Sequence, residues 1–182
     1  MQYLTIDELE AGLDTIRQSP KDPGVLQFIV RRPRVDAREV LEAAKLDLAD
    51  GLVGDSWRSR GSARMPDRSA HPDMQLNVMN ARAVALVARD RERWALAGDQ
   101  LYIDMDLSAD NLPPGTQLAI GTAVIAVTAI PHTGCKKFEA RFGSAALQFV
   151  NSVTGKALRL RGLNARIVQP GVIRVGDAVK KL

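Results

Sequence analysis

The sequence predicts a mostly β (α+β) fold, a barrel or sandwich with helices near its start and beside its one cysteine. The main observation is a succession of short apolar runs from Gln100 onward, separated by glycine and proline, which is typical of barrels and sandwiches. These runs cover residues 101–105, 117–120, 123–130, 165–168 and 172–175. The chain has 182 residues, 46% of them hydrophobic and 25% charged. This is enough for one core, so we expect a single domain over residues 1–182.

Residues 1–23 are predicted to form a helical extension. Thr5 and Glu8 have the spacing of a capping box, apolar residues follow on one face, and Ser19-Pro20 ends the helix.

The next segment is predicted as a strand followed by a helix. Residues 25–30 are apolar and read as a strand. Asp36 and Glu39 form a second capping-box pattern, which predicts a helix from Asp36 to about residue 48.

Hydrophobic periodicity is lost over residues 51–73, where Ser, Arg, Pro and Gly dominate. A loop this long is usually functional or disordered. Guanidinium groups suit a phosphate, so its arginines could converge on one, although each alone is typical of an exposed loop. They are Arg58, Arg60, Arg64 and Arg68.

Regular structure is predicted to resume after this loop. Asn80 is expected to cap a helix over residues 81–96 that Gly98 ends. The remaining predicted elements are a strand at 75–79, tight hairpin turns at 121–122 and 169–171, a helix at about 138–150, and an exposed strand at 158–162 whose arginines share one face.

Composition excludes several classes of function. A net charge of +4 suits a local anion site better than a polyanion-coating surface, so nucleic acid is not an expected partner. One cysteine supplies neither an internal disulfide nor an iron–sulfur cluster. No glycine-rich phosphate loop is present, which argues against tightly held ATP or NAD. The chain lacks an apolar stretch of about 18 residues, and its first ten residues are acidic, so we expect a cytoplasmic protein without a membrane partner.

Cys135 lies in the segment Pro131-His-Thr-Gly-Cys-Lys-Lys-Phe138, where a strand is predicted to turn into a helix. Gly134 allows close approach by a ligand or another backbone. Lys136, Lys137, His132 and a helix N-terminus would favour the thiolate, which soft metals and sulfur transfer require. The alternative is a small buried hydrophobe.

The two histidines receive weaker interpretations. His132 as a base for Cys135 is less favoured than a capping or turn-stabilising His132, because no orienting acid is evident. His71 has no neighbouring metal ligand and is assigned no role.

Several ordered segments together resemble the MOSC domain, over roughly residues 24–180. They are Gly51-Leu-Val-Gly-Asp55, Gln75-Leu-Asn-Val-Met79, the stretch 104–121 with Pro114-Gly-Thr-Gln-Leu-Ala-Ile-Gly121, the Cys135 segment, and Gly171-Val-Ile-Arg-Val-Gly-Asp177. The resemblance implies a β-barrel with peripheral helices. It also implies that Cys135 receives sulfur or ligates the molybdenum of a pterin cofactor. The candidate cofactor-binding residues are Lys136, Lys137, Arg141, His132, Arg64 and Asp55.

The chain departs from the pattern of MOSC relatives that reduce N-hydroxylated compounds. His132-Thr-Gly134 stands where many relatives have an arginine and a proline before the cysteine. Ser56-Trp-Arg58 follows Asp55 where an arginine and a histidine are expected. These departures argue against N-hydroxylated substrates. We also expect no pyridoxal-phosphate domain of the kind found in full-length sulfurases.

Three functions follow as hypotheses. The first is a molybdenum-cofactor-dependent oxidoreductase that acts on a small molecule, has Cys135 as molybdenum ligand and takes electrons from a partner reductase. The second is a sulfur carrier or cofactor-delivery module in which Cys135 carries a persulfide received from a cysteine desulfurase. The third is a non-catalytic binding domain whose arginine loop meets an acidic partner.

Overall fold

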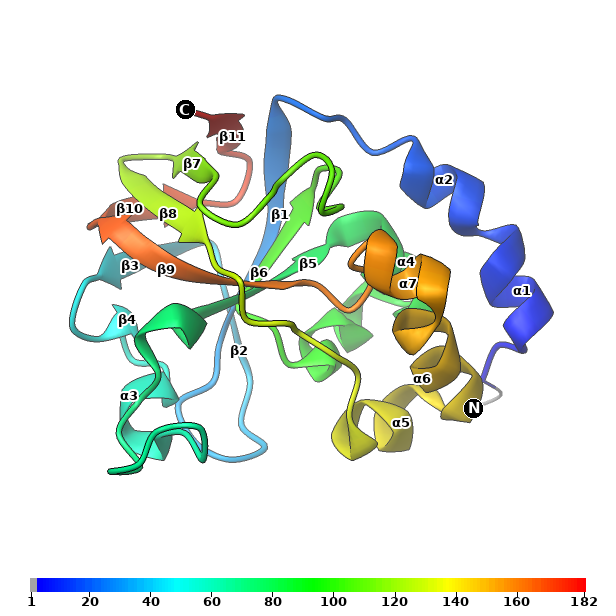
Figure 1. Ribbon diagram of the computed structural model, residues 1–182, viewed down its shortest axis with the longest axis horizontal. Coiled ribbons are helices and arrows are strands. Elements are labelled where there is room, and N and C mark those ends of the chain that lie inside the picture. Colours follow the sequence, from blue (N-terminus) through cyan, green and yellow to red (C-terminus); the bar gives the residue numbers. More distant parts are fainter. Residues whose placement is uncertain (1–2) are drawn as a thin grey trace.

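A closed, mixed β-barrel of seven strands forms the centre of the computed structural model, which describes residues 3–182 (Figure 1). The strands are β1 (Gly24–Arg31), β5 (Leu76–Asn80), β6 (Leu101–Asp104), β7 (Gln117–Ile120), β8 (Ala123–Val127), β9 (Leu163–Gln169) and β11 (Ala178–Lys181). They follow the order β11-β7-β8-β9-β5-β6-β1, and the pairing of β1 with β11 closes the barrel. Only β5 and β6 run parallel among these pairs. The predicted mostly β barrel with peripheral helices is confirmed.

A small second sheet and a layer of helices surround the barrel. The strands outside the barrel are β2 (Glu39–Leu41), β3 (Ala43–Asp47), β4 (Gly51–Leu52) and β10 (Gly171–Arg174). The helices are α1 (Ile6–Ala11), α2 (Leu13–Arg17), α3 (Trp57–Arg60), η1 (Pro72–Met74), α4 (Ala81–Ala88), η2 (Arg91–Ala97), α5 (Lys136–Phe142), α6 (Ser144–Asn151) and α7 (Val153–Ala157). Figure 1 shows α1, α2 and α4–α7 gathered on one side of the barrel, while α3 lies apart beside β4.

The hydrophobic core has two parts because alternate residues of a strand face opposite sides. In β6, Leu101 and Ile103 belong to the cluster inside the barrel, whereas Tyr102 between them belongs to the cluster beneath the helices. That second cluster also contains Phe138 of α5 and Phe149 of α6. The helices are therefore held against the outside of the barrel by buried side chains. In residues 3–182, no helix has the length and apolar character needed to span a bilayer.

The helix predicted from Asp36 to about residue 48 is wrong. Asp36 has φ 60°, which does not suit an N-cap, and the chain continues as β2 and β3. β2 pairs with β1, while β3 pairs with β10 from the far end of the chain. Ala44 and Leu46 are buried and Lys45 between them is exposed, so the segment does alternate as a strand should. Long-range pairing outweighs the local capping pattern.

Other predicted elements occur with changed limits. The capping box of Thr5 and Glu8 is confirmed, and Asn80 caps α4 as expected. The N-terminal helix breaks into two at Gly12; residues 1 and 2 of the predicted extension lie outside the described residues. The helix expected over 81–96 breaks at Arg89, which has φ 64°, and Gly98 caps its second half. The helix expected over 138–150 occurs as α5 and α6.

Two predictions in the C-terminal third are wrong. Residues 158–162 form a turn after α7 in which Arg159 has φ 48° and Arg161 is buried, so they are not an exposed strand. The turn at 169–171 does not close a hairpin, because β9 pairs within the barrel and β10 pairs with β3. The hairpin at 121–122 is confirmed, since β7 and β8 pair across it.

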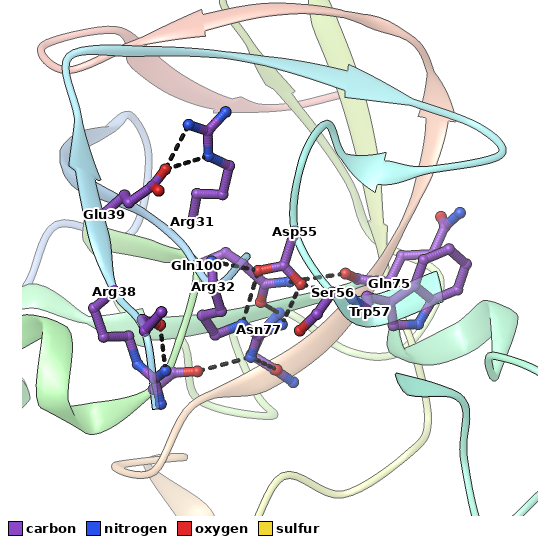
Figure 2. Close-up of polar contacts among 12 residues, drawn as sticks. Arg31, Arg32, Arg38, Glu39, Asp55, Ser56, Trp57, Gln75, Asn77 and Gln100 are labelled. Carbon is purple, nitrogen blue, oxygen red and sulfur yellow. Dashed lines mark hydrogen bonds and ion pairs between the residues drawn. The ribbon is translucent and has the colours of Figure 1, made fainter. Parts of the chain in front are cut away.

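A buried ion pair connects the barrel to the segment after β4. Arg32, at the end of β1, donates from Nε and Nη2 to the two carboxylate oxygens of Asp55 at 2.9 and 3.0 Å (Figure 2). Its Nη1 donates to Asn77 Oδ1 at 2.9 Å and to the Gly98 carbonyl at 2.8 Å. The side chain of Arg32 is 5% exposed and that of Asp55 is fully buried. One guanidinium thus joins β1, β5, the 53–56 segment and the end of η2.

Buried amides extend this network across the barrel. Gln100 accepts from the Asn77 backbone N–H at 2.7 Å and donates to the Gln75 carbonyl at 3.0 Å. Asn77 also donates to Asn164 Oδ1 at 2.7 Å. Because every member is hydrogen-bonded, the network adds rigidity without leaving polar atoms unsatisfied.

We expect Asp55→Asn to lower the free energy of unfolding by about 3–5 kcal/mol, because it leaves the Arg32 charge buried without a counter-charge. The matched control is Asp50→Asn, which breaks an exposed ion pair with Arg58 and should cost less than about 1 kcal/mol. Urea denaturation measures both. Equal losses in the two variants would contradict the role given to Asp55, and the double variant Arg32→Met, Asp55→Leu should recover part of the loss.

Candidate functional site

Cys135 is the N-cap residue of α5, at the end of the segment that leads from β8 to that helix (Figure 1). The expected turn from strand to helix is confirmed. The thiol-bearing residue is exposed, so the alternative of a small buried hydrophobe is wrong. Gly134 is clamped by Asn151, which accepts from its N–H at 2.9 Å and donates to its carbonyl at 3.2 Å. A Cβ on Gly134 would lie 2.7 Å from Leu147, so the close neighbour that requires this glycine is α6.

Cys135 borders a cavity of about 210 Å³ that is rich in basic side chains. The basic residues are Arg32, Arg34, Arg38, Arg60, Lys137, Arg141 and Arg161, and His132 joins them. Asp36 is the one carboxylate in this lining, among residues 3–182. We call this cavity the cysteine pocket. Its excess of positive charge favours an anionic ligand.

Two donors of the cysteine pocket have no partner. Arg38 Nε and Arg161 Nε are buried without a hydrogen bond among the described residues. Burial, and then the charges of Arg141 and Arg32, lower the pKa of Arg38. Buried donors are rarely left unpaired, and crowded cations are stabilised by a nearby anion. The unpaired donors and the crowded cations both favour binding of an anionic acceptor in this pocket.

Arg141 is positioned by the parts of the chain that frame the pocket mouth. Its Nη1 donates to the Leu96 carbonyl at 2.8 Å, and its Nη2 donates to Asp36 Oδ1 at 3.2 Å. The guanidinium therefore bridges η2, α5 and the segment after β1. The Asp36 carboxylate is 70% exposed, so this ion pair is weak and leaves Arg141 able to turn toward an anion.

His132 and Arg161 share one buried carboxylate. His132 Nε2 lies 2.8 Å from Asp99 Oδ1, and Arg161 Nη1 donates to Asp99 Oδ2 at 2.6 Å. Burial favours a raised pKa for Asp99, but the Arg161 and His132 interactions outweigh it and the pKa is lowered. Burial and the Arg161 charge lower the pKa of His132, against the opposite effect of Asp99.

These shifts assign the proton on His132. An ionised carboxylate only accepts hydrogen bonds, so a neutral His132 must carry its proton on Nε2 and donate it to Asp99. Nδ1 is then an unprotonated acceptor. His132 was expected to cap or stabilise a turn. It is instead held by a buried carboxylate, that of Asp99, which is 33 residues away in the sequence.

The predicted site residues are only partly brought together. Cys135, His132, Lys137 and Arg141 all line the cysteine pocket. The other three are outside its lining: Lys136 is exposed, Arg64 is exposed on the 61–70 segment, and Asp55 holds Arg32 from behind.

The arginine loop does not converge as a unit. Of its four arginines only Arg60 reaches the cysteine pocket, while Arg58 pairs with Asp50 and Arg64 and Arg68 are exposed. An acidic partner for the exposed ones stays a prediction. His71, which was assigned no role, caps η1 by accepting from the Asp73 N–H at 3.1 Å.

Four basic residues that line the cysteine pocket were not predicted as site residues. Arg32, Arg34 and Arg38 follow β1, and their signal is the run Arg31-Arg-Pro-Arg34 directly after an apolar strand. Arg161 was expected on the exposed strand predicted at residues 158–162. It does line the pocket, but from a buried turn.

We expect acid to destabilise the fold through His132. Its pKa is lowered in the folded state, so the unfolded chain binds the proton first and stability is lost as the pH falls below about 6.5. His132→Gln keeps an N–H for Asp99 but cannot titrate, so its free energy of unfolding should fall less than that of the wild type between about pH 6.5 and 5. Urea denaturation across this range tests it, and parallel curves would contradict the assignment.

Comparison with known proteins places the chain in a family. The model of the MOSC domain matches residues 65–180. No curated protein matches the chain. Among solved structures, the YUAD protein from Bacillus subtilis has a TM-score of 0.62 at 14% identity, covering 87% of this chain and 95% of that one. A hypothetical protein has a TM-score of 0.58 at 22% identity (88% and 70% covered). YiiM from Escherichia coli has a TM-score of 0.55 at 20% identity (87% and 69% covered). The chain belongs to the MOSC domain family.

Proposed function

We propose that the chain binds the molybdenum–pterin cofactor through Cys135 and acts as an oxidoreductase on a small molecule, with electrons supplied by a partner reductase. One observation carries the proposal: an exposed cysteine stands at the edge of a cavity lined by seven arginine and lysine side chains. A thiolate suits molybdenum, and a cluster of guanidinium groups suits a phosphate.

The donor set fits the anionic end of such a cofactor. Arg38 and Arg161 each have a buried Nε without a partner among residues 3–182, and Lys137 is exposed beside them. These groups would hold a phosphate by charge-assisted hydrogen bonds. The cavity of about 210 Å³ is smaller than the roughly 300–1,000 Å³ of typical ligand pockets. It would therefore hold one end of the cofactor rather than enclose it.

Cys135 would be the protein's single ligand to the metal. No group of three His, Cys, Asp or Glu side chains suitable for a metal ion occurs within residues 3–182. When bound, the cofactor would supply a redox-active molybdenum centre. The chain's part is to fix that centre by one thiolate, neutralise its anionic groups, and leave it open to substrate and reductase at an exposed helix end.

We expect Cys135→Ser to lose molybdenum relative to the wild type when both are purified from a host that makes the cofactor, because the metal ligand is weakened. Lys136→Gln is the matched control, since it removes the adjacent charge but lies outside the cysteine pocket. Elemental analysis for molybdenum and fluorescence of the oxidised pterin provide the readouts. Metal-free wild-type protein, or full retention by Cys135→Ser, would contradict the proposal.

The open position of Cys135 also favours a second candidate, a sulfur carrier. In this role the Cys135 thiolate attacks the outer sulfur of a cysteine desulfurase persulfide. A new sulfur–sulfur bond forms, the sulfur–sulfur bond of the donor breaks, and the desulfurase thiolate leaves. No external oxidant is needed, and the exposed N-terminal end of α5 gives the donor access.

For the carrier role we expect mass spectrometry to detect one added sulfur on Cys135 after incubation with a cysteine desulfurase and cysteine. Cys135→Ser should stay unmodified, and a desulfurase without its active cysteine should modify neither protein. An unmodified Cys135 under conditions in which the desulfurase releases sulfide would rule this role out.

A further inference from the structure

A second and larger cavity, of about 480 Å³, adjoins the cysteine pocket. These two residues line both cavities. The remaining walls come from the 128–133 segment, α7 and the turn that follows it, with Val150 of α6. We call it the α7 cavity. Its volume lies within the roughly 300–1,000 Å³ of small-molecule sites.

The walls of the α7 cavity combine an apolar lining with positive charge. Ile130, Pro131, Val150 and Leu163 provide apolar surface. Lys156, Arg159 and Arg161 provide three cations, and no carboxylate belongs to the lining that the described residues form. An apolar body with one acidic group is the ligand class that satisfies both features.

Two of these cations differ in how they are held. Arg159 is anchored, because its Nη1 donates to the Leu112 carbonyl at 2.7 Å, and burial lowers its pKa. Lys156 is exposed on α7, and its side-chain ammonium makes no hydrogen bond or ion pair among residues 3–182. A partly buried cation such as Arg159, whose pKa is lowered, gains from an added anion. A free ammonium can reach that anion at little cost in competing contacts.

His132, whose ring lines both cavities, adds an acceptor at their border. Its Nε2 is committed to Asp99, and its Nδ1 has no partner among the described residues. An unprotonated ring nitrogen accepts from a hydroxyl or amino group. The cavity thus offers cations for an acidic group and an acceptor for a separate donor.

We propose that the α7 cavity binds a small organic acid with an apolar body and a hydroxyl donor. The carboxylate interacts with Lys156 and Arg159, the apolar body lies against Ile130 and Leu163, and the hydroxyl donates to His132 Nδ1. Since His132 and Arg161 also border the cysteine pocket, this ligand lies next to the site of the proposed chemistry. Binding of this ligand requires no cofactor, so it is tested separately from the molybdenum proposal.

The probe is 4-hydroxybenzoate, titrated into the protein as purified and followed by two-dimensional NMR of backbone amides. We expect shifts at Gly155, Gly162 and Leu163, which line the α7 cavity, and smaller ones at Gly98 and Phe138, which line the cysteine pocket alone. The neutral isostere 4-hydroxybenzamide should bind about tenfold more weakly, because it lacks the charge that Lys156 and Arg159 recognise.

Variants separate the two cavities. Lys156→Gln should weaken 4-hydroxybenzoate about tenfold and leave 4-hydroxybenzamide unchanged. Lys137→Gln, the matched control in the cysteine pocket, should change neither. Thr133 is an exposed residue of the cavity wall. Thr133→Phe introduces an aromatic ring there that should fill the α7 cavity and abolish binding of both probes. Spectra without ligand establish that each variant is folded.

Three results would overturn the proposal. They are the absence of amide shifts at millimolar 4-hydroxybenzoate, shifts confined to the cysteine pocket, and equal affinities of wild type and Lys156→Gln for the acid.

Discussion

The buried pair of Arg32 and Asp55 is the interaction on which the candidate site depends. It lies where β1 ends, and it ties together the barrel, the segment after β4 and the end of η2. Removing two ions from water is costly unless their remaining hydrogen-bonding groups are satisfied. Here Asn77, Gly98 and backbone N–H groups satisfy them. Arg32, which lines the cysteine pocket, is therefore held at a fixed position by the contacts that Figure 2 shows.

Two further carboxylates hold arginines of the cysteine pocket, one buried and one exposed. Asp55 and Asp99 are fully buried and hold Arg32 and Arg161, whereas the exposed Asp36 holds Arg141 loosely. Asp55 and Asp99 lie outside the lining of the cysteine pocket, and only Asp36 belongs to it. The cations of the lining therefore outnumber its carboxylates. Positions fixed before a ligand arrives reduce the entropy lost on binding. This gradient gives the cysteine pocket a rigid side and an adjustable side.

The MOSC domain match and the barrel establish the family, and the arrangement around Cys135 is what motivates a cofactor role. His132 belongs to a buried charge cluster beside Cys135. Its carboxylate partner, Asp99, also pairs with Arg161, so one buried anion organises the wall between two cavities. A substitution of Asp99 should therefore alter both cavities.

The resemblance to the MOSC domain implied the barrel. The sequence patterns by themselves determined the mostly β class, the N-terminal capping box, the Asn80 cap, the 121–122 hairpin and Cys135 at the turn into a helix. Each of these depends on residues close in the chain, where apolar periodicity, caps and glycine turns act directly. The tertiary structure alone decided that residues 39–47 are strands, because their partners are β1 and β10. It also decided which of the chain's 25 lysines and arginines meet at Cys135. Arg32 and Arg161 are brought there by Asp55 and Asp99, 23 and 62 residues away, and such long-range ion pairs leave no local pattern in a sequence.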